Sequence, residues 1–293
     1  MTRVALLGTG HMGAAMSRAL ARSGFELVLY NRTPKRAETL AAELGARTAA
    51  TPAEAVASAD VALSMVADEA AVEALYRAPD GAIAGIHPGV VLADMSTVPP
   101  SVAAGLEADV RAAGGALLDA PVSGSVGLAE AGELTIMVGG RAEHLERARP
   151  VLDALAKRVF HLGPLGQGAA MKLAVNTLIF GLNQALAEGF VIAERAGIEP
   201  ELAYDVLAAS AAGAPYVGYK RAAFLAPDAT PPAFTVELAA KDLRLITGLA
   251  DALGVPVPQA RTNLDVLRAA AAGGRAEADF SAVAVHLRGG GTA

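Results

Sequence analysis

A lysine and an asparagine stand four residues apart inside a long apolar stretch of the sequence. These residues are Lys172 and Asn176, and a spacing of four puts both on one face of a helix. An ammonium group in apolar surroundings either extends to solvent or stays inside at a cost, and an ordinary surface lysine is the alternative to a functional one. Burial disfavours the charged form of a lysine and brings proton exchange toward working pH. Lys172 is therefore a candidate acid/base, with Asn176 beside it.

The element that must position these two residues is the stretch from Gly168 to Ala196. It contains no proline, it follows Pro164 by a few residues, and Gly197 comes directly after it, which predicts one continuous helix. Such a helix would be roughly 40 Å long and apolar over most of its circumference, which is typical of a buried helix. We expect part of it to be covered by another subunit, in a homodimer or homotetramer.

A glycine-rich turn lies at the start of the chain. Val4–Leu7 is predicted as a buried strand, and a helix is predicted to about Arg22. The turn between them has the pattern G-x-G-x-x-G, in which the glycines allow a tight turn, close approach of a pyrophosphate and close helix–strand packing. The helix N-terminus offers N–H groups to phosphate oxygens. We favour dinucleotide binding over a plain glycine turn, with these candidate cofactor residues: Gly8, Thr9, Gly10, His11, Met12 and Gly13.

The end of the next predicted strand, residues 26–30, indicates which dinucleotide binds. NAD enzymes usually place a carboxylate there, whereas this chain has Asn31, Arg32 and Thr33, followed by Lys35 and Arg36. A guanidinium can bind a 2′-phosphate that a carboxylate would repel. The sequence therefore predicts NADP, with NAD possible if Arg32 is only a solvated surface charge.

Strand and helix patterns then alternate through the first half of the chain. Strands are predicted at residues 61–66, 90–93, 116–119 and 134–138, with helices between them. This alternation predicts an α/β fold with an N-terminal Rossmann domain, a doubly wound parallel sheet. Ligands of such sheets bind beyond the carboxyl ends of the strands, which here places Met65, Val66 and Thr97 among the candidate cofactor-binding residues.

A further loop follows the predicted strand 116–119. It contains Ser123, Gly124 and Ser125, whose hydroxyl and backbone N–H groups could bind a carboxylate. An ordinary polar turn is the alternative interpretation.

Strand patterns disappear after residue 163. Helices are predicted at 201–211, 234–253, 259–271 and 280–287, with a loop around Pro215 to Lys220. We therefore divide the chain into an NADP-binding Rossmann domain, residues 1–163, and an all-helical domain for substrate and dimerisation, residues 164–293, organised on the long helix.

Composition excludes several classes of function. The net charge of −6 argues against nucleic-acid binding. The sequence has no cysteine, which excludes disulfides and thiolate metal sites and fits a cytoplasmic location. The five histidines have no metal-ligand spacing, so no metal is expected. Asn183, Gln184 and Glu188 interrupt the longest apolar run, so no membrane span is expected.

Four motifs together resemble the β-hydroxyacid dehydrogenase family, the group that contains 3-hydroxyisobutyrate dehydrogenase, tartronate semialdehyde reductase and glyoxylate/succinic semialdehyde reductases. The resemblance covers essentially the whole chain. The motifs are Gly8-x-Gly10-His11-Met12-Gly13, Asp119-Ala120-Pro121-Val122-Ser123-Gly124, Gly166-x-Gly168-x-x-x-Lys172-x-x-x-Asn176 and Lys241-Asp242-Leu243.

The resemblance implies a role for each motif. Lys172 would be the catalytic acid/base and Asn176 would hold the substrate, while Ser123 and Gly124 would bind its carboxylate. Thr97 and Lys241 would lie along the nicotinamide side of the cofactor. Ser125 stands where members of the family often have a second glycine, and Thr177 where 3-hydroxyisobutyrate dehydrogenases often have a second asparagine. Both departures concern the choice of substrate.

The expected function is an NADP-dependent oxidoreductase that interconverts a short β- or γ-hydroxy acid and its aldehyde or keto acid. One alternative is an imine reductase on the same scaffold, although those relatives usually replace the lysine. Oxidative decarboxylation of 6-phosphogluconate is disfavoured, because that family has a much longer helical part. A non-catalytic NADP-binding sensor or interaction protein is the alternative outside enzymes.

Overall fold

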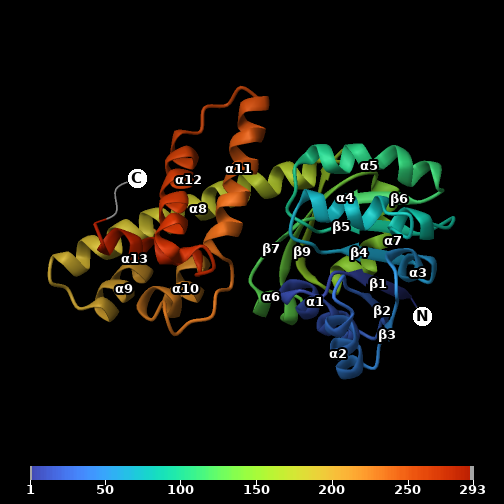
Figure 1. The fold of residues 1–293 in the computed structure, drawn as a ribbon, viewed down its shortest axis with the longest axis horizontal. Coiled ribbons are helices and arrows are strands. Elements are labelled where there is room, and N and C mark those ends of the chain that lie inside the picture. The colour runs from blue at the N-terminus through green and yellow to red at the C-terminus, as the bar shows by residue number, and fades with distance from the viewer. Residues whose placement is uncertain (1, 291–293) are drawn as a thin grey trace. The chain divides into compact units, whose positions relative to one another are not determined.

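The computed structural model describes residues 2–290 and divides into two compact units between Lys172 and Leu173. The first unit is an α/β sheet domain and the second is helical, which confirms the predicted fold class (Figure 1). Helix α8 (Gln167–Arg195) begins in the first unit and continues into the second. The division therefore falls inside the predicted long helix, nine residues after residue 163.

A sheet forms the centre of the first unit. Its strands in residues 2–290 are β1 (Arg3–Leu7), β2 (Glu26–Tyr30), β3 (Arg47–Thr48), β4 (Val61–Ser64), β5 (Val91–Asp94), β6 (Ala116–Asp119), β7 (Val122–Ser123), β8 (Leu134–Gly139) and β9 (Ala156–Gly163). The order is β3-β2-β1-β4-β5-β6-β8-β7, with β9 paired to β8. Strands β1 to β6 are parallel, as predicted, but β8 is antiparallel to β6 and β7. The predicted parallel arrangement does not extend to this strand, because the connection from β7 to β8 is too short for the usual parallel crossover.

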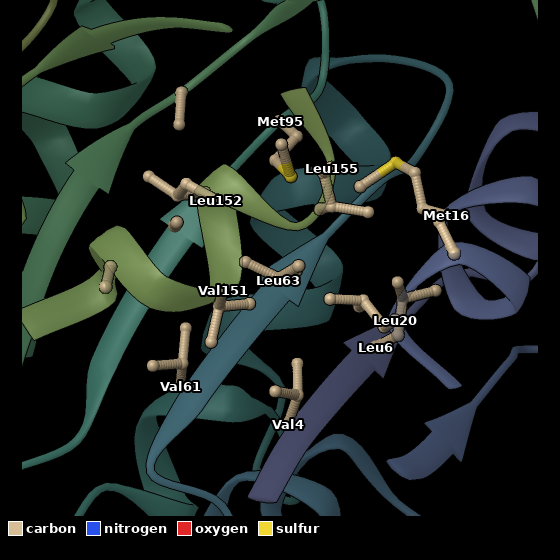
Figure 2. Close-up of a cluster of buried hydrophobic side chains, with 14 of the residues drawn as sticks. Val4, Leu6, Met16, Leu20, Val61, Leu63, Met95, Val151, Leu152 and Leu155 are labelled. Carbon is tan, nitrogen blue, oxygen red and sulfur yellow. The ribbon is translucent and has the colours of Figure 1, made fainter. Parts of the chain in front are cut away.

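Helices cover both faces of this sheet. They are α1 (His11–Arg22), α2 (Pro34–Leu44), α3 (Pro52–Ala57), α4 (Glu69–Arg77), the 3-10 helix η1 (Ala82–Gly85), α5 (Pro100–Ala112), α6 (Val126–Ala131) and α7 (Ala142–Asp153). Side chains alternate along β1, so Val4 and Leu6 pack in one core and Ala5 and Leu7 in the other. Figure 2 shows the first core, where Leu6 meets Met16 and Leu20 of α1. The sheet is therefore buried on both faces, as doubly wound folds require.

The carboxyl edge of the sheet carries one row of paired positions. Leu7 pairs with Ser64, Ser64 with Asp94, Asp94 with Asp119 and Asp119 with Gly139. Paired residues of neighbouring parallel strands point to the same face of the sheet. Ser64, Asp94 and Asp119 therefore lie side by side at the edge where doubly wound proteins bind their ligands.

The second unit has a core of its own. Its helices are α8 from Leu173 onward, α9 (Pro200–Ala209), α10 (Pro215–Leu225), α11 (Val236–Ala252), α12 (Pro258–Ala270), the π-helical turn η2 (Ala271–Arg275), the 3-10 helix η3 (Phe280–Ala282) and α13 (Val283–Arg288). Helix α10 lies where a loop was predicted, so that prediction is wrong. Tyr216, Val217 and Phe224 of α10 are buried in the helical core, and this packing stabilises a helix that Gly218 would weaken.

Helix α8 is buried on one side only. Phe180, Ala187 and Phe190 pack in the core of the second unit, whereas Leu178 is 71% exposed and Ile192 69% exposed. By length and composition alone α8 would be long and apolar enough to cross a membrane, and 44% of its most apolar window is buried inside the protein. The packed aromatic residues identify it as the central helix of a folded unit.

Candidate active site

The glycine-rich turn joins β1 to α1 and lies against the loop after β4. Gly8 has φ +109, and a Cβ there would lie 2.3 Å from the carbonyl oxygen of Met65. A Cβ at Gly13 would lie 2.0 Å from the carbonyl oxygen of Gly8, so only glycine lets α1 pack this closely on the turn. Gly10 is different, since a Cβ there would meet nothing within 4 Å. The middle glycine therefore faces open space, as a position that must admit a phosphate group does.

The N-terminus of α1 offers donors beside this open space. Helix α1 begins at His11 with Gly10 as its N-cap and no side-chain hydrogen bond to the cap, His11 is exposed and Met12 is half-buried. The buried Thr9 hydroxyl has no hydrogen-bond partner within residues 2–290. A pyrophosphate fits these groups, because it would accept from the N–H groups of the first turn and from a hydroxyl.

The loop after β2 is tied to the glycine-rich turn. The side-chain oxygen of Asn31 accepts a hydrogen bond of 3.1 Å from Thr9 N, and its amide group donates to the Thr33 carbonyl at 3.0 Å. Arg32 and Thr33 are exposed. A cavity of about 300 Å³ between α1 and α2 is lined by Thr9, Lys35 and Arg36 among others. Basic side chains of α2 thus line part of the space next to the turn, which Glu43 also lines.

A buried network supports the loops after β4 and β5. The Oδ1 atom of Asp94 accepts from the hydroxyls of Ser64 at 2.7 Å and Ser96 at 2.8 Å. Ser96 Oγ in turn accepts from Val66 N at 3.0 Å. Burial raises the pKa of Asp94, although the serine hydroxyls oppose this shift. The network fixes the backbone at Val66 and the side chain of Ser96. The half-buried Thr97 is the next residue in the chain.

The candidate carboxylate-binding residues follow β6 at the same edge. Ser123 ends β7 and is half-buried, and Gly124 is exposed with φ +150. The Ser125 hydroxyl accepts from Leu128 N at 3.3 Å and caps α6. Ser125 therefore has a structural contact in addition to the role predicted for it.

Lys172 lies on the second turn of α8. The first turn is held to β6 by Asp119, whose Oδ1 accepts from Gly166 N and whose Oδ2 accepts from Ala169 N, both at 2.7 Å. Lys172 is half-buried. The candidate acid/base thus extends from a helix that is fixed at the carboxyl edge of the sheet, in the same unit as the glycine-rich turn.

Asn176 is four residues further along α8, inside the second unit. It is buried, and its amide group donates to Asp242 Oδ2 at 2.8 Å. Asp242 Oδ1 lies 2.8 Å from Lys241 Nζ. The structure therefore links two predicted site residues, Asn176 and Lys241, through Asp242. No role was predicted for Asp242 from the sequence, although its place directly after Lys241 in the fourth motif was a usable signal for this contact.

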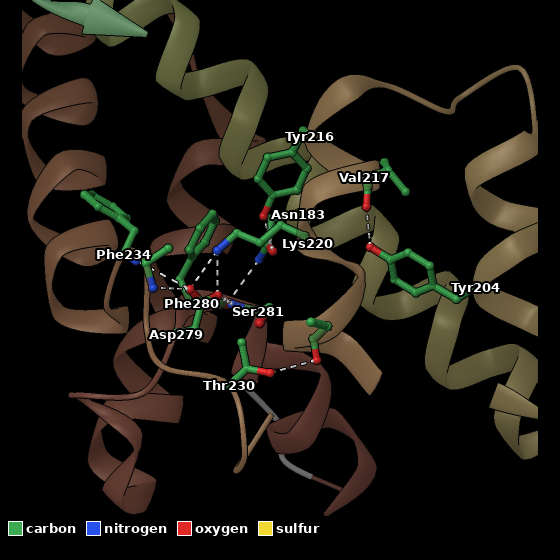
Figure 3. Close-up of polar contacts among 12 residues, drawn as sticks. Asn183, Tyr204, Tyr216, Val217, Lys220, Thr230, Phe234, Asp279, Phe280 and Ser281 are labelled. Carbon is green, nitrogen blue, oxygen red and sulfur yellow. Dashed lines mark hydrogen bonds and ion pairs between the residues drawn. The ribbon is translucent and has the colours of Figure 1, made fainter. Parts of the chain in front are cut away.

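Another polar cluster of the second unit contains no predicted site residue (Figure 3). Lys220 Nζ lies 2.7 Å from both oxygens of Asp279, and both side chains are buried. Asp279 also accepts from the backbone N–H groups of Ala233 and Ser281. Asn183, which follows Asn176 by two turns, accepts from the Tyr216 hydroxyl at 2.7 Å. This cluster joins α8, α10 and η3 and is a structural feature of the helical core.

The fold and the residues at the carboxyl edge of the sheet define a class of protein. This class is a dinucleotide-binding oxidoreductase with a Rossmann unit followed by a helical unit. The profile of the NAD binding domain of 6-phosphogluconate dehydrogenase matches residues 3–163. The profile of the NAD-binding domain of NADP-dependent 3-hydroxyisobutyrate dehydrogenase matches residues 166–287. Among residues 2–290 no group of three or more histidine, aspartate or glutamate side chains could hold a metal ion.

Relatives along the full chain narrow the class to a family. An NAD-dependent L-serine dehydrogenase of Pseudomonas aeruginosa is 36% identical over 97% of both chains. Glyoxylate/succinic semialdehyde reductase 2 of Arabidopsis thaliana is 33% identical over 97% of this chain and 79% of its own. The crystal structure of a 3-hydroxyisobutyrate dehydrogenase from Salmonella typhimurium has a TM-score of 0.90 and 31% identity, over 97% of this chain and 99% of that one. The chain belongs to the β-hydroxyacid dehydrogenase family and is an NAD(P)-dependent oxidoreductase.

Proposed function

We propose that the protein interconverts a short β- or γ-hydroxy acid and its aldehyde or keto acid with NADP(H), and that Lys172 is the general acid/base. The observation that carries the proposal is the attachment of α8 to the sheet. Asp119 fixes the first turn of α8 at the edge that carries the glycine-rich turn, and Lys172 follows on the second turn. When bound, the nicotinamide cofactor supplies or accepts a hydride.

Lys172 completes that chemistry with a proton. Reduction of a carbonyl carbon leaves charge on its oxygen, and the Lys172 ammonium donates a proton there while stabilising the developing alkoxide. In the oxidation direction the neutral amine accepts the hydroxyl proton. A half-buried position on a fixed helix suits this exchange, because the side chain is neither fully solvated nor sealed inside.

Asn176 and Lys241 act from the second unit. Asp242 Oδ2 accepts from the NH₂ group of Asn176 and so sets which way the amide faces. In our proposal Asn176 orients the substrate, and Lys241, paired to the same carboxylate, lies toward the nicotinamide side of the cofactor.

Substrate recognition is assigned to the loop after β6. The backbone and hydroxyl groups of Ser123, Gly124 and Ser125 would bind the substrate carboxylate by hydrogen bonds. Thr97, Met65 and Val66 would line the cofactor together with the glycine-rich turn. These groups would recognise the carboxylate that the candidate substrates share.

The direct test measures NADPH oxidation with glyoxylate, succinic semialdehyde, tartronate semialdehyde and methylmalonate semialdehyde, and NADP⁺ reduction with L-serine and 3-hydroxyisobutyrate. We expect turnover with at least one compound and a loss of about 10³-fold or more in kcat for Lys172→Ala, with NADPH still bound. NADPH binding without any turnover across this panel would favour the non-catalytic alternative. An imine reductase would instead turn over a cyclic imine and none of these acids.

We also propose that NADP is preferred over NAD. Arg32 supports this, since a guanidinium forms a bidentate contact with phosphate, and Lys35 and Arg36 line the cavity beside the turn. Arg32→Ala should lower kcat/KM for NADPH by about 10-fold to 100-fold and leave that for NADH nearly unchanged. The matched control is Arg158→Ala, an exposed arginine on β9. A wild-type preference for NADH would contradict the assignment.

The proposed assembly is a homodimer or homotetramer. Leu178 and Ile192 are 14 residues apart on one face of α8, and Leu202 and Val206 on α9 are 58% and 61% exposed. Exposed apolar side chains grouped on helices are typical of subunit interfaces. Light scattering of the purified protein should give two or four times the mass of one chain, and a monomer at micromolar concentration would contradict this.

We place the protein in the cytoplasm, because the proposed reaction draws on a dissolved pool of nicotinamide cofactor. Cell fractionation should recover the NADPH-dependent activity with the cytoplasmic fraction. Activity confined to another fraction would contradict the placement.

A further inference from the structure

We infer that Asp119 is a positioning residue for Lys172: its buried carboxylate fixes the first turn of α8 to the carboxyl edge of the sheet and thereby sets where the lysine stands. The inference rests on the proposed function of Lys172. Asp119 touches neither substrate nor cofactor in this account, and it acts through the helix.

The two hydrogen bonds of Asp119 are long-range in sequence. Asp119 is the last residue of β6 and is 3% exposed, and its two oxygens accept from backbone groups 47 and 50 residues later. Each oxygen accepts from one of these N–H groups at 2.7 Å, at the short end of the range for N–H···O bonds. The bonds are made to Gly166, just before α8, and to Ala169, in its first turn. The carboxylate therefore constrains both the direction of the first turn of α8 and its position along the helix axis.

The packing around Asp119 leaves the helix start no room to shift. A Cβ at Gly139, its partner on β8, would lie 2.3 Å from Asp119 Oδ1. A Cβ at Gly168 would lie 2.4 Å from the Met137 carbonyl oxygen and 2.6 Å from that of Asp119. Glycine at both positions allows the ends of β6 and β8 and the first turn of α8 to touch backbone to backbone. A joint of this kind transmits a change at Asp119 directly into the helix.

Lys172 is close enough along α8 to follow such a change. It lies three residues after Ala169, less than one turn, at a rise of about 1.5 Å per residue. Reacting groups tolerate little error, since a displacement of about 1 Å can cost about 100-fold in rate. A small rotation or shift of the first turn therefore matters for catalysis far more than for the stability of the whole helix, most of which packs in the second unit.

The test is Asp119→Asn in the full-length protein, assayed with whichever substrate the wild type turns over. The amide keeps the volume but presents an N–H₂ group to one of the two backbone donors, so one of the two bonds is lost. We expect kcat to fall by about 10-fold to 100-fold, the dissociation constant for NADPH to stay within about twofold, and hydrogen exchange at the amides of residues 166–170 to become faster. If Asp119→Asn does not fold, the same measurements are made on Asp119→Ser, whose hydroxyl keeps one acceptor.

A matched control makes the same chemical change at another helix start. Glu199 caps α9 by accepting from Leu202 N at 3.0 Å, so Glu199→Gln also replaces a capping carboxylate by an amide. We expect no change in kcat for this variant. A fall in kcat as large as that of Asp119→Asn would mean that the effect is general loss of stability.

A double variant separates positioning from any other effect. If Asp119 acts through Lys172, adding Asp119→Asn to Lys172→Ala should cause no further loss in kcat. A second loss of full size in the double variant, or a normal kcat with faster exchange in Asp119→Asn alone, would overturn the inference. Failure of the proposed function looks different, because Lys172→Ala would then turn over normally whatever Asp119 does.

Discussion

The two units bury carboxylates in opposite ways. In the sheet unit, Asp94 and Asp119 are surrounded by hydroxyl and backbone N–H donors, and burial raises the pKa of both. In the helical unit, burial would also raise the pKa of Asp279, but the buried Lys220 ammonium outweighs it and lowers that pKa. The sheet unit offers only dipoles to these two carboxylates, whereas the helical unit adds a counter-charge to the dipoles around Asp279.

The difference follows from what each architecture provides. The carboxyl edge of a parallel sheet gathers strand ends and a helix start, so N–H groups are available to a carboxylate there. The helices of the second unit satisfy most of their own backbone groups, and Asp279 has the Lys220 ammonium in addition to backbone N–H groups from the segments beside it. A buried ion pair depends on both members, whereas a carboxylate that accepts through one oxygen, as Asp94 does from two serine hydroxyls, can be replaced by an amide that keeps those bonds.

The largest effect on stability is therefore expected from Asp279→Asn. This change leaves the Lys220 ammonium buried without its counter-charge, which should lower the free energy of unfolding by about 3–5 kcal/mol. Urea unfolding of the full-length protein measures it. The control is Asp205→Asn, which breaks the exposed pair with Arg221 and should cost less than about 1 kcal/mol. Equal losses in the two variants would contradict the contrast.

A smaller effect is expected from Asp94→Asn. The bonds from Ser64 and Ser96 are both accepted by Oδ1, and an amide oxygen can accept the same bonds without a buried charge. The free energy of unfolding at neutral pH should change by less than about 1 kcal/mol. A loss as large as that of Asp279→Asn would show that the sheet unit also needs its charge.

The pH dependence of the same two variants sharpens the comparison. Because the folded pKa of Asp94 is raised above 3.8, wild-type stability relative to Asp94→Asn should fall as pH rises from 3.8 through the folded pKa. The folded pKa of Asp279 is lowered, so its contribution should be present above 3.8 and lost as pH falls through the folded pKa. The difference in unfolding free energy between wild type and Asp94→Asn should therefore fall with rising pH above 3.8. The difference between wild type and Asp279→Asn should rise with pH below 3.8, and slopes of the same sign would contradict the two pKa directions.

The sheet unit was largely predictable from the sequence because a short glycine motif and alternating strand and helix patterns indicate it. The glycine-rich turn needs three glycines at fixed spacing, and the structure shows the close approaches that require two of them. The direction of β8 was not predictable, since an apolar strand pattern carries no information on which way the strand runs.

The helical unit was predictable only in outline. The long helix followed from its proline-free apolar run, but α10 was missed because the segment from Pro215 to Lys220 was interpreted as a loop. Pro215 stands at the first helical position, where proline is favoured, so a signal for the helix was present. The Lys220–Asp279 pair lies 59 residues apart in sequence, and no spacing rule connects residues across such a distance. The same holds for Asp119, which reaches α8 across 47 residues.

The central claim is that the Lys172 amine transfers the proton that accompanies hydride transfer. Single-turnover measurement of NADPH oxidation by Lys172→Ala, with the aldehyde acid that the wild type reduces fastest, tests it most directly. The account predicts a rate at least about 10³-fold below wild type, with an unchanged dissociation constant for NADPH. A single-turnover rate close to wild type would contradict it.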